Sequence, residues 1–315
     1  MKHLFIINPT AAQLRGVMLQ RIQDEITEFF GANQLFNFDV HITRWKRDAV
    51  GFVRRYVNNS SELVRIYAVG GNGTLFEVIN GCARLPNVQV AFLPMGRINS
   101  PIYSFGGSGD PFKSLWSLTT SKIVSLDLIH AGNNFCFIGC FIGLGADADE
   151  QNKMLSKFFF LPRKIIREVI FFWAALRSRP SYYTIKIDGE DLSGEYLSIQ
   201  ICNTPAAASS EFPALWTSMT DGRLELYLIK KPPLRLLSQI VSRFEQGHYY
   251  ARDDYIIQKQ GRSVSIQSDR YISAALDEEH FYGPSFDFTL VPKAVDFVLP
   301  YGIQALQKNV PQEPA

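Results

Sequence analysis

The chain has 315 residues, of which 46% are hydrophobic and 20% are charged, close to the averages of globular proteins. This length exceeds the size to which one hydrophobic core usually grows, so we expect two domains. The 32 basic and 30 acidic residues leave a formal charge of +2, which is too small for wholesale binding to nucleic acid. No nucleic-acid partner is therefore expected, and an electrostatic partner would have to meet a local patch.

Several classes of site and location are excluded by simple patterns. The five histidines lack zinc-helix spacing, and no G-x-S-x-G elbow of an α/β-hydrolase is present. The start, MKHLFIINPT, lacks the features of a signal peptide, and the longest apolar run, Val169 to Leu176, is far shorter than the roughly 20 residues that cross a bilayer. We expect a cytoplasmic protein with reduced, buried thiols at its four cysteines, Cys82, Cys136, Cys140 and Cys202.

Strands and helices alternate over the first 125 residues, which predicts a parallel sheet with helices on both faces, an α/β domain. Such sheets bind ligands at the carboxyl ends of their strands. The expected strands are His3–Ile7, Phe38–Ile42, Val64–Val69 and Val88–Leu93. The expected helices bury Val17, Met18, Ile22, Ile26 and Phe29, then Ala49, Phe52, Val53, Tyr56 and Val57 after an Asp48 cap, and a third helix spans Leu75–Cys82.

After Ser121 the chain reads as short β-branched or aromatic runs between turn residues, which predicts a β-sandwich-like second domain. We place the first domain at residues 1–125 and the second at 126–300, with 301–315 able to return to the first through a helix at Tyr301–Lys308. Two helical stretches interrupt the second domain, at Lys153–Arg177 and Pro233–Gln246. The expected strands are Ile123–Ile129, Phe135–Gly143, Tyr182–Ile187, Tyr196–Cys202, Leu224–Ile229, Val264–Gln267, Tyr271–Leu276 and Phe286–Val291.

A glycine-rich loop, Gly70-Gly71-Asn72-Gly73-Thr74, joins the third strand to its helix. Glycines let backbone N–H groups approach an anion, and a helix start adds partial positive charge. The alternative is a tight turn that needs glycine only for positive φ. Three glycines in four residues, followed by a threonine and a helix, favour phosphate binding.

These residues resemble those of the diacylglycerol kinase and sphingosine kinase family. GGNGTLFEVING, residues 70–81, is similar to the family's G-G-D-G-T-x-x-E-V-x-N-G signature, and Asn8-Pro9-Thr10-Ala11 to its N-P-x-x-G opening. The ordered matches cover nearly the whole chain. They continue through AFLPMGRIN (P-x-G-T-x-N-D), Asp127-Leu128, FIGCFIGLGADAD, ICN at residues 201–203, TDGRLELYLI, Asp277-Glu278-Glu279 (D-G-E) and VPKAVDFVLP.

The resemblance implies transfer of the γ-phosphoryl group of ATP to a lipid hydroxyl with Mg²⁺. Asp277 or Glu279 would accept the hydroxyl proton. Asp221 would hold a structural Mg²⁺, with backbone oxygens at Ser218 and Arg223. The nucleotide would lie among Asn8, Pro9, Thr10, Ala11, Thr43, Gly70, Gly71, Asn72, Gly73, Thr74, Gly96 and Arg97, supported by Glu77 and Asn80.

The chain departs from the family at sensitive positions. Asn72 and Ser100 each stand where the family has aspartate, so two acidic anchors for a hydrated Mg²⁺ are lost. Losing one preorganised electrostatic group costs about 2.7 to 4 kcal/mol of barrier, so family chemistry is expected to be severely slowed. Arg97, in place of threonine, either binds phosphate directly or points to solvent. Glu278 occupies a turn position where the family has glycine.

The segment 153–177 combines an apolar face with basic flanks. Such a helix can lie on an anionic membrane, or it can bury its apolar face against its own sheet. Peripheral membrane contact through this segment is therefore one of two alternatives. A homodimer is a separate possibility that the sequence does not decide.

Three hypotheses remain. The first is an ATP-dependent lipid kinase acting on diacylglycerol, a sphingoid base or a related alcohol. The second is a nucleotide- or lipid-binding protein that transfers nothing. A kinase of a soluble substrate shares the glycine signature but does not explain the matches in the second domain.

Overall fold

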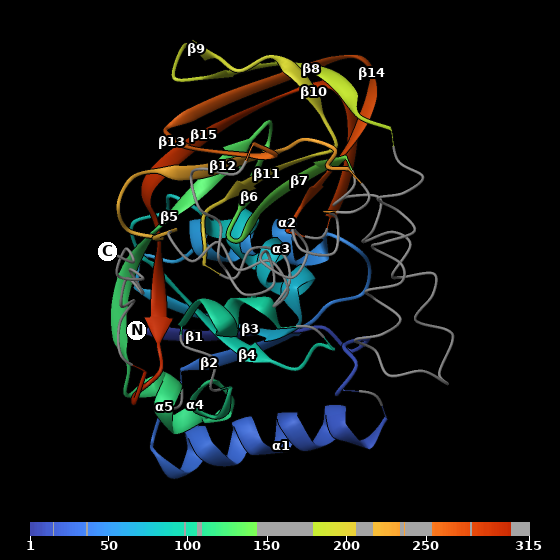
Figure 1. Ribbon diagram of the computed structural model, residues 1–315. Coiled ribbons are helices and arrows are strands. Elements are labelled where there is room, and N and C mark those ends of the chain that lie inside the picture. Colours follow the sequence, from blue (N-terminus) through green and yellow to red (C-terminus); the bar gives the residue numbers. More distant parts are fainter. Residues whose placement is uncertain are drawn as a thin grey trace. The chain divides into compact units, whose positions relative to one another are not determined.

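The computed structural model describes residues 1–143 apart from 15, 36, 98 and 106–108, residues 179–205, and residues 217–303 apart from 234–235, 237–253 and 278. The chain forms two compact units (Figure 1). The first unit comprises Met1–Leu128, Met219–Asp221 and Val291–Gln307, and the second comprises Ile129–Ser218, Gly222–Leu290 and Lys308–Ala315.

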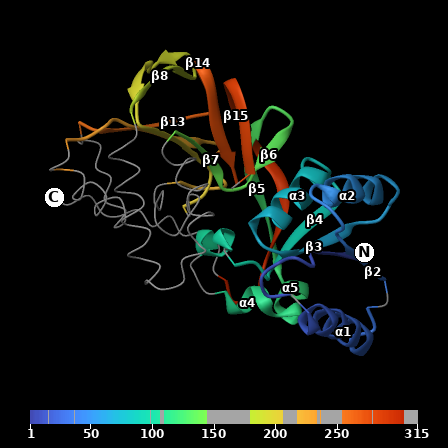
Figure 2. The ribbon, with the colours of Figure 1, turned by 90° about the vertical axis from the view of Figure 1, so that its right-hand side faces the viewer.

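The first unit is built on a parallel sheet, as the alternating pattern predicts. Its strand order is β2–β1–β3–β4, followed by the end of β15 (Glu279–Leu299) beside β4. Every pair is parallel. Helices cover both faces, with α1 and α5 on one and α2 and α3 on the other (Figure 2). The strands are β1 (Lys2–Ile7), β2 (Phe38–Ile42), β3 (Val64–Gly70) and β4 (Val88–Pro94).

Helix α1 (Val17–Ala32) buries a different stripe from the one expected. Ile22 and Ile26 are buried as predicted, but Phe30 rather than Phe29 completes the inner face, at a constant spacing of four residues. Val17 and Met18 are 69% and 44% exposed, so the prediction that they lie in the core is wrong. The buried stripe packs against a cluster that includes Phe5, Ile7, Tyr67 and Val69 of the sheet.

Helices α2 (Asp48–Asn58) and α3 (Asn72–Cys82) pack closely together on the other face. A Cβ on Gly81 would lie 2.7 Å from Val53 Cβ, so this contact needs glycine. The expected Asp48 cap is wrong, because Asp48 lies inside the helix and its carboxylate accepts from Arg44 N at 3.0 Å. The Glu77 carboxylate of α3 instead accepts from Ala49 N, in the first turn of α2, at 3.2 Å.

A buried arginine ties the short helices of the first unit to the sheet. Arg65 of β3 is 6% exposed, and its guanidinium donates to the Leu118 and Thr119 carbonyls, at 2.8 and 3.1 Å, where α5 ends. Tyr301 lies against the same helix, since its N–H donates to Ser117 O at 3.0 Å. These elements are η1 (Ser100–Phe105), α4 (Asp110–Lys113) and α5 (Leu115–Thr119).

The second unit is rich in antiparallel strands, in the order β13–β12–β11–β7–β14–β15, and this confirms the expected β-sandwich-like class. β14 changes partner along its length. Its first half pairs with β8, its last three residues pair with β7, and a bulge lies between Gln267 and Ile272. A bulge of this kind bends a strand and increases its twist, which lets β14 pair with different neighbours at its two ends.

The strand bounds refine the sequence expectations, because several predicted runs are divided or fused. The strands are β5 (Lys122–Ala131), β6 (Asn134–Cys136), β7 (Gly139–Gly143), β8 (Ser181–Ile187), β9 (Glu190–Asp191), β10 (Gly194–Tyr196), β11 (Ser198–Cys202), β12 (Leu224–Ile229), β13 (Ile256–Gly261) and β14 (Ser263–Leu276). β9 and β13 were not predicted from the sequence. β13 has the sequence IIQKQG, which contains too few apolar residues to be recognised as a strand.

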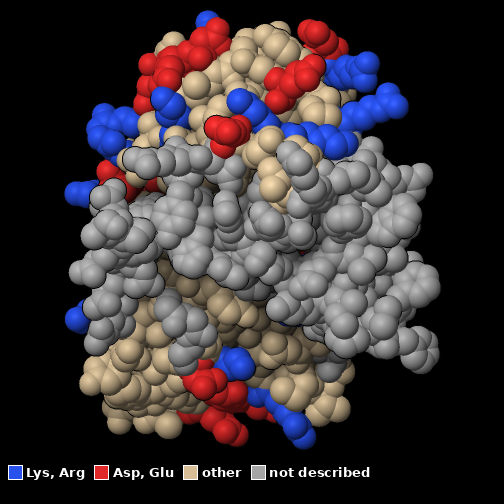
Figure 3. All heavy atoms as spheres, in the orientation of Figure 1, with Lys and Arg blue, Asp and Glu red and all other residues tan. Residues whose placement is uncertain are grey.

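Some sequence predictions fall outside the described residues. These are the segment 153–177, nearly all of 233–246, residues 304–315 and Glu278. None of the helices in the described part is long and apolar enough to cross a membrane. On the face shown in Figure 3, the described Lys and Arg side chains are interspersed with Asp and Glu, in keeping with the small net charge.

Candidate functional site

The carboxyl ends of β1, β3 and β4 meet at one edge of the parallel sheet of the first unit. Asn8 N donates to Val69 O at 3.0 Å, which joins the chain after β1 to β3. Met95 N donates to Gly70 O at 2.8 Å, which joins β4 to the glycine loop. The sequence-predicted nucleotide residues of these three loops are therefore neighbours.

Two glycines are required here by close approach rather than by their backbone angles. A Cβ on Gly70 would lie 2.2 Å from Thr74 Oγ1, and one on Gly96 would lie 2.4 Å from Gly71 Cα. None of the glycines in this loop has a positive φ. The alternative explanation, a turn that needs glycine only for positive φ, is thus wrong at Gly70, Gly71, Gly73 and Gly96.

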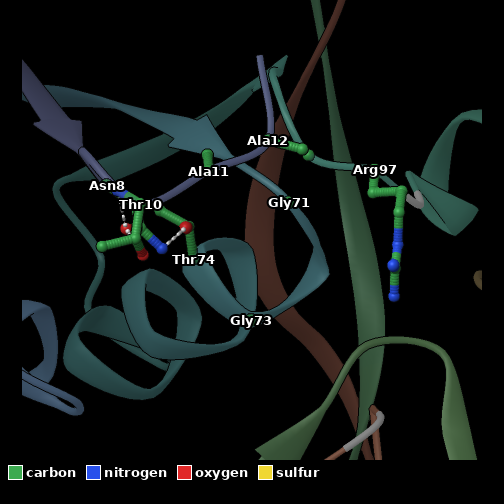
Figure 4. A pocket seen from close by; sticks show the side chains of 9 residues that line it. Asn8, Thr10, Ala11, Ala12, Gly71, Gly73, Thr74 and Arg97 are labelled. Atoms are coloured by element: carbon green, nitrogen blue, oxygen red, sulfur yellow. Dashed lines mark hydrogen bonds between the residues drawn. The ribbon is translucent and has the colours of Figure 1, made fainter. Parts of the chain in front are cut away.

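A pocket of about 510 Å³ opens at this edge (Figure 4). Asn8 organises one side of it, since its Oδ1 accepts from Thr10 N and Thr10 Oγ1 at 3.0 and 2.8 Å. Its Nδ2 donates to Thr74 Oγ1 at 3.3 Å. The pocket is lined by Asn8, Thr10, Ala11, Ala12, Gly71, Gly73, Thr74, Gly96 and Arg97.

Helix α3 begins inside this pocket. Asn72, Gly73 and Thr74, expected as loop, form its first turn, and Gly71 is its N-cap. The first N–H groups of a helix have no acceptor within the helix, and they carry the positive end of its dipole. An anion in the pocket would meet these donors together with the Thr74 hydroxyl, whose oxygen accepts from Asn8 Nδ2 and whose proton can turn to the anion.

Two of the family departures contact each other. Asn72 Nδ2 donates to Ser100 Oγ at 3.0 Å, and Asn72 Oδ1 accepts from Ser100 N at the same distance. Both residues are buried, at 5% and 0% exposure. The pair therefore links the start of α3 to η1 through two neutral hydrogen bonds.

Arg97 is the single cation among the described lining residues. Its side chain is exposed, and within the described residues it has no hydrogen bond or ion pair. In Figure 4 the side chain extends away from the Asn8–Thr74 pair. The guanidinium can therefore change rotamer without losing a partner.

The supporting residues named from the sequence have structural contacts. Glu77 accepts from Arg47 N and Ala49 N at 2.8 and 3.2 Å, so its carboxylate holds the start of α2. Asn80 is buried, and its Nδ2 donates to Phe76 O at 2.8 Å. Thr43 N donates to Ile7 O at 2.9 Å and extends the β1–β2 pairing.

Two polar residues and one apolar residue at this site were not predicted from the sequence. Gln13 Nε2 donates to Gly96 O at 3.0 Å, and Asn99 Oδ1 accepts from Gly96 N at 3.2 Å, so these side chains shape the Gly96 loop. Ala12 lines the pocket. The position of Asn99 in the P-x-G loop was a usable signal, whereas nothing in the sequence links Gln13 to a residue 83 positions away.

In the second unit, Asp277 is held by three backbone donors. Its Oδ1 accepts from Ile138 N and Gly139 N at 2.8 and 3.0 Å, and its Oδ2 accepts from Phe137 N at 2.6 Å. The residue has φ 47° in the turn between β14 and β15. Burial raises the pKa of Asp277 to about 6, against the opposing effect of the three N–H groups. A carboxylate offers about four lone-pair positions, so one on Oδ2 is left.

The remaining predicted residues are less enclosed. Glu279 is half-buried at the start of β15, and Asp221 is exposed. The Arg223 side chain donates to Gln260 Oε1 at 3.5 Å. All four cysteines are free and buried, which confirms the expected thiols, and burial raises the pKa of the Cys82 thiol to about 12.

The first unit is a parallel α/β domain with a glycine-lined pocket at its strand ends, and the second unit is sandwich-like. This combination is the architecture of diacylglycerol kinase-like proteins. Family models agree. Residues 2–131 match the diacylglycerol kinase catalytic domain, and residues 141–299 match the YegS C-terminal NAD kinase beta sandwich-like domain. The chain belongs to this diacylglycerol kinase and YegS-like lipid kinase family, as its motifs indicate.

Known proteins share the arrangement at low identity. The chain is 23% identical to a protein of Shewanella frigidimarina named "Probable lipid kinase YegS-like", over 86% of this chain and 88% of that one. A solved structure described as a diacylglycerol kinase from Bacillus anthracis has a TM-score of 0.67 and 16% identity, and covers 96% of this chain and 98% of its own. These likenesses support the fold across both units.

The family implies a catalytic Mg²⁺, and the residues beside the glycine loop do not fit one. Mg²⁺ is a hard cation that is usually bound through one or two carboxylates. Here an amide and a hydroxyl occupy the two aspartate positions, and they are bonded to each other. Within the described residues, moreover, no group of three His, Cys, Asp or Glu side chains could hold a metal.

Proposed function

We propose that this protein is a lipid kinase of its family, which binds ATP in the glycine-loop pocket and transfers a phosphoryl group to the hydroxyl of a lipid. The observation that carries the proposal is the pocket itself, where Gly71, Gly73, Thr74 and Thr10 surround the start of α3. Backbone donors and hydroxyls in this arrangement are complementary to a polyphosphate.

The division of tasks follows the family. Residues 1–125 are assigned to the nucleotide, and residues 126–300 to a lipid alcohol such as diacylglycerol or a sphingoid base. In the transfer, the bond from the γ-phosphorus to the ADP oxygen breaks and a bond to the lipid oxygen forms. The hydroxyl proton goes to Asp277 or Glu279. The pKa of Asp277, about 6, suits a group that accepts a proton near neutral pH.

Two further assignments stay predictions. Asp221, with backbone oxygens at Ser218 and Arg223, would hold a structural Mg²⁺. Contact with a membrane is expected because the acceptor is a lipid, and the segment 153–177 is the proposed contact. The proposal places the protein in the cytoplasm, at the membrane periphery.

A second candidate function is favoured by the Asn72–Ser100 pair. Phosphoryl transfer depends mainly on positioned charge, and this pair supplies none at two positions where the family has aspartate. The protein would then bind nucleotide or lipid and transfer nothing.

The experiment that separates the two uses labelled ATP, Mg²⁺ and a panel of lipids in mixed micelles. The parent chain is compared with the triple variant Asn72→Asp, Arg97→Thr, Ser100→Asp. Turnover by the parent supports the kinase. If the parent chain shows no phosphoryl transfer and the triple variant does, the result supports the binding protein. If neither protein transfers phosphate and neither binds ATP, the nucleotide site is refuted.

A further inference from the structure

We propose that this site binds its nucleotide as the metal-free polyphosphate, with the cation Arg97 in place of a bound Mg²⁺. The inference rests on the proposed function, because it assumes that the pocket holds ATP. It goes further by specifying which ionic form of the nucleotide the site recognises, and it predicts that Mg²⁺ is not needed for binding.

Both polar atoms of the Asn72 amide are hydrogen-bonded to Ser100 rather than directed to a metal ion. Its oxygen accepts from the Ser100 backbone N–H, and its nitrogen donates to the Ser100 hydroxyl, both at 3.0 Å. Flipping the amide would set its NH₂ group against the Ser100 N–H, so these two bonds fix one orientation. The Ser100 N–H already occupies one of the two lone pairs of the amide oxygen, so a cation would have to reach the other lone pair inside a contact between two buried residues.

The pair lies next to the pocket lining, between Gly71 and Gly73 in the case of Asn72, and it also changes the charge beside the pocket. Two aspartates at these positions would repel each other and a polyphosphate, and a divalent cation would relieve that repulsion. The Asn72–Ser100 pair is neutral, and no acidic side chain is present among the described lining residues. The anion therefore meets no negative charge that a metal must screen.

Arg97 supplies positive charge in the same pocket. A guanidinium binds phosphate through two parallel N–H···O bonds and, unlike Mg²⁺, needs no carboxylate to hold it. Since Arg97 has no partner within the described residues, it can turn to a phosphate without breaking an existing contact. The start of α3 and the Thr74 hydroxyl provide the other donors.

This arrangement predicts whether Mg²⁺ strengthens or weakens the binding of ATP. In solution Mg²⁺ binds ATP and occupies phosphate oxygens. A site that recognises the free polyphosphate should therefore bind ATP in EDTA at least as tightly as in excess Mg²⁺. A site that uses the metal should show the opposite order.

Isothermal titration of the full chain with ATP tests this, once in EDTA and once in excess Mg²⁺. The variant Asn72→Asp, Ser100→Asp should lose roughly tenfold or more in affinity in EDTA and recover it with Mg²⁺, since one charged contact is worth about that factor. The variant Asn72→Ala, Ser100→Ala removes the pair without adding charge, and, like the parent chain, it should bind ATP in EDTA at least as tightly as in excess Mg²⁺.

The double variants change buried residues and could fail to fold, so a substitution of the exposed Arg97 provides a second test. Arg97→Ala should weaken ATP binding roughly tenfold in EDTA, whereas Lys113→Ala, an exposed cation on α4, should not. Binding of ATP only with Mg²⁺, or an unchanged affinity in Arg97→Ala, would overturn the inference and leave the proposed function standing. Binding in neither buffer would overturn both.

Discussion

Gly96 and Gly71 approach so closely that a Cβ on Gly96 would lie 2.4 Å from Gly71 Cα. The contact joins the loop after β4 to the N-cap of α3, and Gly96 N also donates to Gly70 O at 3.1 Å. Since the obstructing atom belongs to the backbone, no side chain can turn aside to make room. The shape of the pocket at the strand ends therefore depends on this contact.

Gly96→Ala is expected to separate the two loops, to destabilise the protein by about 1–3 kcal/mol and to abolish ATP binding. Thermal unfolding and ATP titration measure the two effects. Gly109→Ala is the matched control, because among the described residues its Cβ would meet Ile102 Cδ1 alone, at an ordinary contact distance of 3.5 Å. Retained ATP affinity in Gly96→Ala would show that the close approach is not needed for the pocket.

The alternating pattern was enough to predict the parallel sheet, and the bounds of Phe38–Ile42 and Leu224–Ile229 match those of β2 and β12. The face of α1 was predicted only in part. Hydrophobicity shows which residues can be buried, but it does not show where along its length a helix loses contact with the sheet. Val17 and Met18 lie in the exposed first turn for this reason.

The candidate site could be predicted as a set of residues but not as a set of contacts. Asn72 and Ser100 were both recognised as departures from the family, yet their hydrogen bonds join residues 28 positions apart. The three donors to Asp277 come from a strand entry almost 140 residues earlier in the chain. Such partners depend on the tertiary fold, and no local pattern in the sequence encodes them.

Glu77 stabilises the start of a helix other than its own. Its carboxylate accepts from Arg47 N and Ala49 N, where α2 begins without a capping side chain from its own sequence. Loss of a helix cap costs about 0.5–2 kcal/mol, so Glu77→Ala should lower the free energy of unfolding by about that amount. Urea denaturation measures the change.

Glu77→Gln is the control for charge, because its amide oxygen can still accept one of the two bonds. We expect it to be less destabilised than Glu77→Ala. If instead both variants unfold like the parent while ATP binding is lost, Glu77 acts on the nucleotide rather than on α2.

Arg65 is a buried cation whose described partners are neutral. Besides the carbonyls at the end of α5, its Nε and Nη2 donate to Gln89 Oε1 at 3.0 and 2.8 Å. Arg65→Met keeps the apolar stem but leaves these acceptors without a donor. Since an unsatisfied buried acceptor costs about 1–3 kcal/mol, we expect a loss of roughly 3 kcal/mol in unfolding experiments.

Arg54→Met is a useful comparison, because Arg54 is exposed and donates a single bond, to Asn80 O at 3.2 Å. It should cost much less than Arg65→Met. Equal losses in the two variants would mean that the hydrogen bonds of Arg65 contribute little beyond its packing.

Asp277 should make the stability of the protein depend on pH in a direction unusual for a carboxylate. Burial raises its pKa to about 6 from the ordinary value of 3.8. Between these two pH values the folded chain holds a proton that the unfolded chain has released, so unfolding becomes easier as the pH rises. The contribution is fully present below the lower value and is lost once the pH passes the upper one, a change of about 3 kcal/mol.

Asp277→Asn carries a side chain that does not titrate, so the stability of the parent minus that of the variant should fall by up to about 3 kcal/mol between pH 4 and pH 7. Urea denaturation across this range measures it. Asp269→Asn, an exposed acid of the same unit, corrects for the general effect of removing one carboxylate. A difference that stays constant with pH would show that the three backbone donors cancel the effect of burial on the Asp277 carboxylate.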